Sequence, residues 1–104
     1  MTTLVVLFNL KSDADRATYE AWAQSTDLPI VRDLTSVDAF DVYRTSGRLG
    51  TDDPAPYEYV EIIQVNDMET FGGEVKSETM QKVAAEFREF ADAPCFMLSE
   101  ALGS

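Results

Sequence analysis

The chain has 104 residues, of which 45% are hydrophobic, so it is long enough for one globular domain over residues 1–104 and too apolar to be disordered. Its 19 acidic and 8 basic residues give a net charge of −11, and this field repels phosphate backbones and anionic lipids, which argues against nucleic acid and membrane partners. The absence of histidine excludes a Ser-His-Asp triad and nearly every common zinc site, and the single Cys95 excludes an intrachain disulfide.

The N-terminal stretch predicts a buried strand. Residues Leu4 to Leu10 form a nearly continuous apolar run, which is typical of a strand covered on both faces. The run is too short for a membrane span, and no basic segment precedes it as in a signal peptide. We therefore expect a cytoplasmic protein.

A helix is predicted next, over residues 13–26. Ser12 and Asp15 have the spacing of a capping box and mark its start. Apolar and aromatic side chains then recur at helical spacing, so one face of the helix is buried. These side chains are Tyr19, Trp22, Ala23 and Thr26.

The end of this helix carries an acid beside a proline. Pro29 disfavours a helical conformation at Leu28 and lacks a backbone donor, so we expect the helix to end or kink there, with a further turn over residues 29–34. Asp27 is thereby placed at the C-terminal edge of the helix, close to whatever the aromatic face covers. A carboxylate is the less favoured charge at that end, which indicates either a solvated turn or a functional group.

Two strands joined by a loop follow. Alternation predicts a strand over residues 37–45. One face of this strand carries Val37, Ala39, Asp41 and Tyr43, and the other carries Asp38, Phe40, Val42 and Arg44. Residues 46–56 hold two Gly, two Pro and two Asp, which predict a loop, and residues 57–65 are rich in β-branched and aromatic side chains, which predict the third strand.

The last third of the chain predicts helices and a final strand. Asn66 and Glu69 have the spacing of a cap for a short helical segment. Apolar side chains at helical spacing predict a longer helix over residues 77–91, and Pro94 precedes a strand over residues 95–102.

The predicted order β-α-β-β-α-β is that of an α+β, ferredoxin-like fold, a four-stranded antiparallel sheet with both helices on one face. The other face is left bare, although the strands are apolar on both sides. A second copy of the chain is the simplest cover for such a face. We therefore expect a homodimer in which two sheets face each other as a dimeric α/β barrel.

Four stretches of the sequence resemble one family. They are Trp22 to Val31 (WAQSTDLPIV), Ser36 to Phe40 (SVDAF), Pro56 to Glu61 (PYEYVE) and Val83 to Pro94 (VAAEFREFADAP). They span nearly the whole chain and resemble the RedY-like, HapK-type proteins. The resemblance implies the dimeric α+β barrel fold and an association with prodigiosin-type pyrrole and bisindole alkaloid pathways.

The resemblance also marks Asp27. Many barrels of this superfamily carry a His-x-Pro turn after the first helix, with the histidine facing the pocket, and the similar stretch here reads Asp27-Leu28-Pro29. The resemblance therefore implies a pocket position for Asp27 and argues against chemistry that relies on an imidazole.

Two acids are the candidate catalytic residues. Burial of Asp27 against Trp22 and Tyr19 would raise the pKa of its carboxyl and allow proton transfer near neutrality; otherwise Asp27 caps or solvates a turn. Glu61 stands in the middle of the third strand, so its carboxylate points either to solvent or into a polar pocket.

Several other residues are candidates for binding a flat ligand. Tyr57 and Tyr59 share a strand face with Glu61, and two phenols beside an acid suit an aromatic ligand with N–H donors, unless they pack a dimer interface. Asn9 either faces the helices as a hydrogen-bonding group or ends the first strand. The predicted substrate-binding set is Asn9, Trp22, Phe40 and Tyr59.

Three functions are consistent with these features. The first is a cofactor-independent enzyme of secondary metabolism that needs no metal and uses Asp27 and Glu61 as acid/base groups on a pyrrole- or indole-type intermediate. Cyclisation, condensation, tautomerisation and hydration all fit this description. The second is a non-catalytic protein that binds or shields an unstable pathway intermediate. The third is a cofactor-free monooxygenase, which the missing histidine disfavours.

Overall fold

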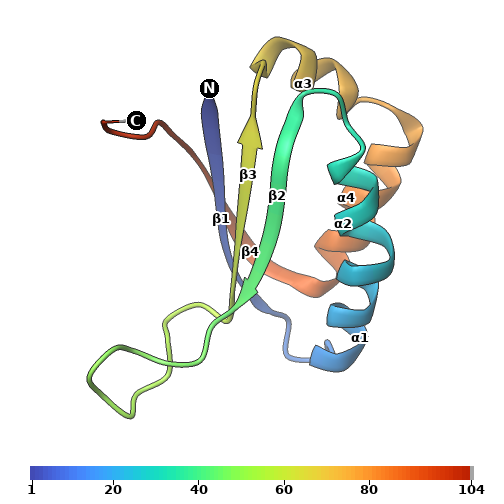
Figure 1. Ribbon diagram of the computed structural model, residues 1–104. Coiled ribbons are helices and arrows are strands. Elements are labelled where there is room, and N and C mark those ends of the chain that lie inside the picture. Colours follow the sequence, from blue (N-terminus) through green and yellow to red (C-terminus); the bar gives the residue numbers. More distant parts are fainter. Residues whose placement is uncertain (104) are drawn as a thin grey trace.

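Four antiparallel strands form one sheet, and the helices pack on a single face of it (Figure 1). The computed structural model describes residues 1–103. The strand order is β2-β3-β1-β4, with β1 (Thr2–Leu10), β2 (Val37–Arg44), β3 (Tyr59–Val65) and β4 (Ala91–Ser99). The helices are α1 (Arg16–Trp22), the π-helix η1 (Ala23–Asp27), α2 (Leu28–Arg32), α3 (Met68–Glu74) and α4 (Glu78–Phe90). The predicted ferredoxin-like fold is confirmed.

The first helical segment continues through Pro29. Asp27 and Leu28 both have helical backbone angles, with φ of −64° and −59°, so the helix does not end at Leu28; of the two predicted alternatives, an end or a kink, the end was wrong. The reason is η1, in which the Leu28 N–H donates to the Ala23 carbonyl five residues earlier. This bulge shifts the hydrogen-bond pattern before Pro29. Pro29 then occupies the first turn of α2, where a missing N–H costs little.

Two helix caps differ from those predicted. Helix α1 begins after Asp15, whose side chain accepts a hydrogen bond from the Thr18 N–H, so Ser12 is not the cap. Helix α3 is capped by Asp67 rather than Asn66, and the Asn66 amide donates instead to residues before and in β2. In both helices the aspartate directly before the first helical residue takes the cap, because an N-cap side chain binds N–H groups of the first turn.

Strand β2 contains a bulge. Val37 and Ala39 lie opposite consecutive residues of β3, so Asp38 is the extra residue between them. Val37 therefore shares the helix-facing side with Phe40, and both are buried. The predicted grouping of Val37 with Ala39 on one face was wrong.

Strands β3 and β4 begin at other residues than predicted. Strand β3 begins at Tyr59, two residues later, because the Asn9 side chain rather than a strand backbone binds the Glu58 N–H. Strand β4 begins at Ala91, directly after α4, and thus contains Pro94. A proline is tolerated there because β4 is an edge strand, where one N–H is not needed for pairing.

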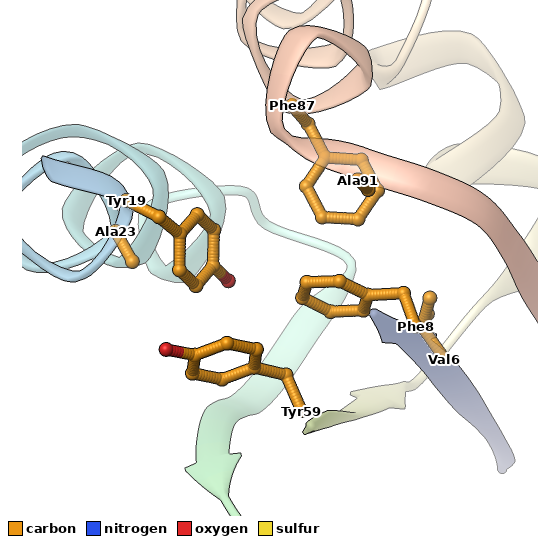
Figure 2. Close-up of a cluster of buried hydrophobic side chains, with 7 residues drawn as sticks. All are labelled: Val6, Phe8, Tyr19, Ala23, Tyr59, Phe87 and Ala91. Carbon is orange, nitrogen blue, oxygen red and sulfur yellow. The ribbon is translucent and has the colours of Figure 1, made fainter. Parts of the chain in front are cut away.

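The core lies between the sheet and the helices and is rich in aromatic rings (Figure 2). Tyr19 of α1 packs on Tyr59 of β3 with ring centroids 4.8 Å apart, and Phe8 of β1 meets Phe87 of α4 at 4.9 Å. A second cluster continues this layer toward α2 and consists of Val31, Val37, Phe40, Ile63, Val65 and Met80. The two clusters fix α1, α2 and α4 against the sheet.

None of the helices formed by residues 1–103 covers the opposite face of the sheet (Figure 1). The strand register places Ile62 of β3, Val5 of β1 and Met97 of β4 side by side on that face. Val5 and Ile62 are half-buried and Met97 is exposed. The chain therefore has the uncovered apolar face that the sequence predicts.

Candidate functional site

Asp27 lies at the end of η1, its side chain is buried between the helices and the sheet, and its exposed fraction is 5%. Tyr19, Ala23 and Asp27 recur at intervals of four residues, and all three are buried. They form the inner stripe of α1 and η1, which faces the sheet. Asp27 is therefore not a solvated turn residue.

Glu61 faces the helices from the middle of β3, and its exposed fraction is also 5%. Along the strand it lies between Tyr59 of the first core cluster and Ile63 of the second. Across the sheet, Val42 of β2 and Val6 of β1 are its partners. The carboxylate thus stands in the buried layer and not on the bare face.

The pKa values of both acids are raised. Burial raises the pKa of Asp27 to about 7. Burial, and then the charge of Asp27, raise the pKa of Glu61 to about 8. Because the two groups interact, the values describe the titration of the pair. Between pH 7 and pH 8 the pair therefore holds about one proton.

Two buried polar atoms, one of which belongs to this pair, have no hydrogen-bond partner. Among the side chains of residues 1–103, the buried oxygens without a hydrogen bond are the Tyr19 hydroxyl and Glu61 Oε2. Leaving a buried donor or acceptor unsatisfied costs about 1–3 kcal/mol. Burial, followed by the charges of Glu61 and Asp27, raises the pKa of the Tyr19 phenol well above its usual value, so the phenol stays protonated.

Two hollows flank the acids. A smaller one of about 110 Å³ has Tyr19, Val42 and Tyr59 in its wall. A larger one of about 200 Å³ lies between α4 and β4, has a mostly apolar wall, and includes Asp27 and Phe96. Val42, Glu61, Val6 and Phe96 follow one another across the sheet. Glu61 therefore lies between the two hollows.

Tyr59 is the predicted binding residue that reaches a hollow. Its ring is buried, and its hydroxyl donates to the Glu20 carboxylate at 2.7 Å. Glu20 also accepts from Arg44 at 2.7 Å, and both residues belong to the wall of the smaller hollow. Tyr57, which the sequence grouped with Tyr59, lies in the loop before β3 and is 37% exposed.

The structure places the other predicted binding residues elsewhere, in the wall of neither flanking hollow. The Trp22 indole N–H donates to Glu86, and its ring packs on Phe90 at 5.5 Å. Phe40 is a buried member of the second core cluster. The Asn9 amide binds the backbone of the loop before β3, accepting from the Glu58 N–H and donating to the Pro56 carbonyl.

Sequence reasoning assigns no role to the hydroxyl of Tyr19 or to Glu20. Tyr19 fits the apolar stripe of the helix. This pattern explains why the ring is buried, but it does not show what the hydroxyl binds. The available signal is the choice of tyrosine at a core position, since a buried phenol ordinarily needs a hydrogen-bond partner.

Residues 1–103 contain no group of three or more His, Cys, Asp or Glu side chains placed to hold a metal ion. Among the same residues, no helix has the length and apolar character needed to cross a membrane.

Comparisons with known proteins agree with this fold and identify a family. The family model of the REDY-like protein HapK matches residues 2–102. The crystal structure of HapK from Hahella chejuensis is 33% identical, covers 100% of this chain and 95% of its own, and has a TM-score of 0.81. No curated protein matches the chain.

Two more distant structures share the fold alone. SnoaB from Streptomyces nogalater, described as a cofactor-independent oxygenase, is 16% identical, with a TM-score of 0.78 and coverage of 99% of this chain and 94% of its own. The hydroxynitrile lyase from Passiflora edulis is 10% identical, with a TM-score of 0.80 and the same coverage of 99% and 94%. The family model and the HapK structure together show that the chain belongs to the REDY-like HapK family.

Proposed function

We propose that the protein is a cofactor-independent acid/base enzyme of secondary metabolism that acts on a flat pyrrole- or indole-type compound. The observation that carries this proposal is the buried pair of Asp27 and Glu61, both 5% exposed, in a layer flanked by two hollows. Buried carboxyl groups whose pKa values lie near neutrality are common at catalytic sites, because efficient proton transfer needs such values.

The two acids take different roles because their pKa values differ. Near pH 7.5 the pair holds about one proton, and we assign it to Glu61, because the charge of Asp27 adds to burial in raising the pKa of Glu61. Asp27 then serves as the general base, and Glu61 as the general acid or hydrogen-bond donor. This division is the usual result when an environment separates the pKa values of two neighbouring carboxyl groups.

The larger hollow supports a neutral, aromatic ligand. Its wall combines Asp27 with apolar side chains from α4 and β4, including Phe87 and Phe96. An apolar wall with few polar groups suits a ring system, and the net charge of −11 disfavours polyanionic ligands. The resemblance to RedY-like proteins supports the choice of pyrrole and indole rings. The fold itself is compatible with catalysis, as its occurrence in an oxygenase and a lyase indicates.

We also propose that the bare sheet face binds a second copy of the chain, giving a homodimer. The central row of Val5, Ile62 and Met97 is apolar, and no helix of the described residues covers it. A face of this kind requires a partner, and a two-fold axis lets the same face serve both subunits.

Deuterium exchange at C3 of 2-methylindole tests the catalytic role. Exchange at this carbon needs an acid that delivers a deuteron and a base that removes the proton, and it is followed by NMR in D2O near neutral pD. We expect the wild-type protein to accelerate exchange and Asp27→Asn to lower the protein-dependent rate at least 100-fold, as general acid/base catalysis contributes about 10²–10⁴. The matched control is Asp33→Asn, an exposed aspartate at the end of α2, which should exchange at the wild-type rate.

Two results would contradict the enzymatic proposal. A rate for Asp27→Asn within twofold of wild type would remove Asp27 from the chemistry. Saturable binding of 2-methylindole without any accelerated exchange would favour the non-catalytic binding protein instead.

A further inference from the structure

The Tyr19 hydroxyl and Glu61 Oε2 are polar atoms that the folded chain leaves unpaired. Tyr19 is fully buried and Glu61 nearly so, so solvent does not compensate for the missing hydrogen bonds. A phenylalanine at position 19 would fill the same ring space without an unsatisfied hydroxyl. Two buried polar atoms without hydrogen-bond partners, in a layer beside hollows, indicate groups that bind a ligand.

The two groups face one region of the layer between helices and sheet. The Tyr19 ring packs on Tyr59 at 4.8 Å, and Glu61 is two residues from Tyr59 on the same face of β3. Tyr19 belongs to the wall of the smaller hollow and Asp27 to the wall of the larger one. Glu61 belongs to neither wall, but in the sheet it lies between the two hollows, so the three groups surround one part of the layer.

The protonation of these groups is complementary. The Tyr19 phenol stays protonated, because burial and the neighbouring carboxyl groups raise its pKa. Glu61 is mainly protonated near neutrality, whereas Asp27 is partly ionised. The layer thus presents two O–H donors and one carboxylate that can accept a proton.

We propose that the Tyr19 hydroxyl and the carboxylic acid of Glu61 form an oxyanion hole, and that the substrate is an N-heteroaromatic compound with a carbonyl group whose neighbouring carbon carries a removable proton. The inference rests on the proposed function, because Asp27 is the base in both. It narrows that function to chemistry that passes through an enolate.

The step balances within the site. The Asp27 carboxylate takes the proton from the carbon beside the carbonyl, and the C–H electron pair forms a carbon–carbon double bond. The carbonyl π pair moves to oxygen, where Tyr19 and Glu61 donate hydrogen bonds to the negative charge. The carboxylic acid of Asp27 then returns the proton to another carbon conjugated with the enolate, and the oxygen pair re-forms the carbonyl. Alternatively, the enolate carbon attacks a second carbonyl or imine carbon of the same ligand, whose π pair moves to its own heteroatom and takes the proton from Asp27 while the first carbonyl re-forms. Neither route needs an oxidant or reductant.

Donors of this kind act strongly because they are fixed before the charge develops. Loss of one donor from an oxyanion hole typically lowers the rate about 10²–10³-fold. A tyrosine combined with a neutral carboxylic acid is an established donor pair for an enolate oxygen.

Binding of 4-nitrophenol to the Asp27→Asn protein tests the donor pair directly. The ionised probe resembles the enolate in charge and absorbs visible light, and the neutral amide that this substitution introduces resembles the base after it has taken its proton. We expect this variant to bind the ionised probe and to lower the pKa of the bound probe. Addition of Tyr19→Phe should weaken binding at least tenfold and abolish that shift, whereas addition of Tyr57→Phe, a tyrosine in the loop before β3 that lines neither hollow, should leave both unchanged.

Folding of the variants is checked by circular dichroism and thermal unfolding. We expect Tyr19→Phe to be at least as stable as its parent, since it removes an unpaired hydroxyl. Should it fail to fold, Glu61→Leu in the Asp27→Asn background replaces it, with Glu61→Gln, which keeps an N–H donor, as its matched control. Glu61→Leu should lose binding at least tenfold and Glu61→Gln should retain most of it.

Two results would overturn the inference. The first is no binding of ionised 4-nitrophenol to the Asp27→Asn protein. The second is unchanged binding after removal of the Tyr19 or Glu61 donor. If exchange of 2-methylindole nevertheless depends on Asp27, the proposed acid/base function stands without an oxyanion hole, so the two failures are distinguishable.

Discussion

Two carboxyl groups that share a dry layer cannot both ionise at low cost. Each loses its hydration on burial, and the charge of Asp27 raises the pKa of Glu61 further. Near pH 7.5 the favoured state holds about one proton on the two groups together. An ionised base and a neutral acid therefore coexist at the same pH without histidine, which the chain lacks.

This arrangement predicts that stability falls as the pH rises from 5 to 8. The folded pKa values of about 7 and 8 lie above the usual values of 3.8 and 4.5, so the folded protein holds protons that the unfolded chain has released. The stabilisation is complete below pH 4 and is lost as the pH rises through the folded values. Chemical denaturation should show a loss of about 3 kcal/mol or more over this range.

The double variant Asp27→Asn with Glu61→Gln should remove this dependence, and Glu89→Gln, an exposed acid on α4, should retain it. Other groups with shifted pKa values do not change stability between pH 5 and pH 8. The pKa of Glu74 is lowered to about 2 by hydrogen bonds from Ser36 and Thr35, so its contribution is lost only as the pH falls below its usual value of 4.5. A flat wild-type profile between pH 5 and pH 8 would contradict the raised pKa values.

At the scale of elements, the π-helix η1 keeps Asp27 turned toward the sheet. It carries the inner stripe of α1 from Tyr19 through Ala23 to Asp27 and then continues into α2 at Leu28. A π-bulge inside an α-helix often marks a functional site, because it alters which side chains face inward.

Much of the fold is predictable from the sequence because it follows from periodicity. Helical spacing of apolar residues predicts α4, and residue types and alternation predict β3. The loop of Gly, Pro and Asp residues between β2 and β3 follows from turn chemistry. Each of these signals is a pattern over a whole segment, so one residue that departs from the pattern does not change the predicted element.

The features that sequence reasoning misses depend on single hydrogen bonds. The bulge at Asp38, the caps at Asp15 and Asp67 and the π-turn before Leu28 each involve one or two backbone groups. For the site, the sequence predicts Asp27 and Glu61 as candidates, and the structure places both in one buried layer. It does not predict the unpaired Tyr19 hydroxyl, because a pattern of apolar residues contains no information on what a buried oxygen meets.

At the scale of the whole molecule, the bare sheet face predicts a homodimer. Light scattering at micromolar concentration should give twice the mass of one chain. Ile62→Lys places a charge in the central row of that face and should convert the dimer to a monomer, whereas Ala85→Lys on the exposed side of α4 should leave it dimeric. A wild-type protein that is monomeric at this concentration would contradict the proposal.

Carbon-13 NMR titration of the side-chain carboxyl groups tests the central claim most directly. Resonances are assigned with Asp27→Asn and Glu61→Gln, and the pH is varied from 3 to 10. The raised pKa values predict that both resonances titrate near neutrality, with apparent midpoints of about 7 and about 8 for the pair. Two midpoints near 4, as for ordinary solvated carboxyl groups, would contradict a buried acid/base pair and the function proposed from it.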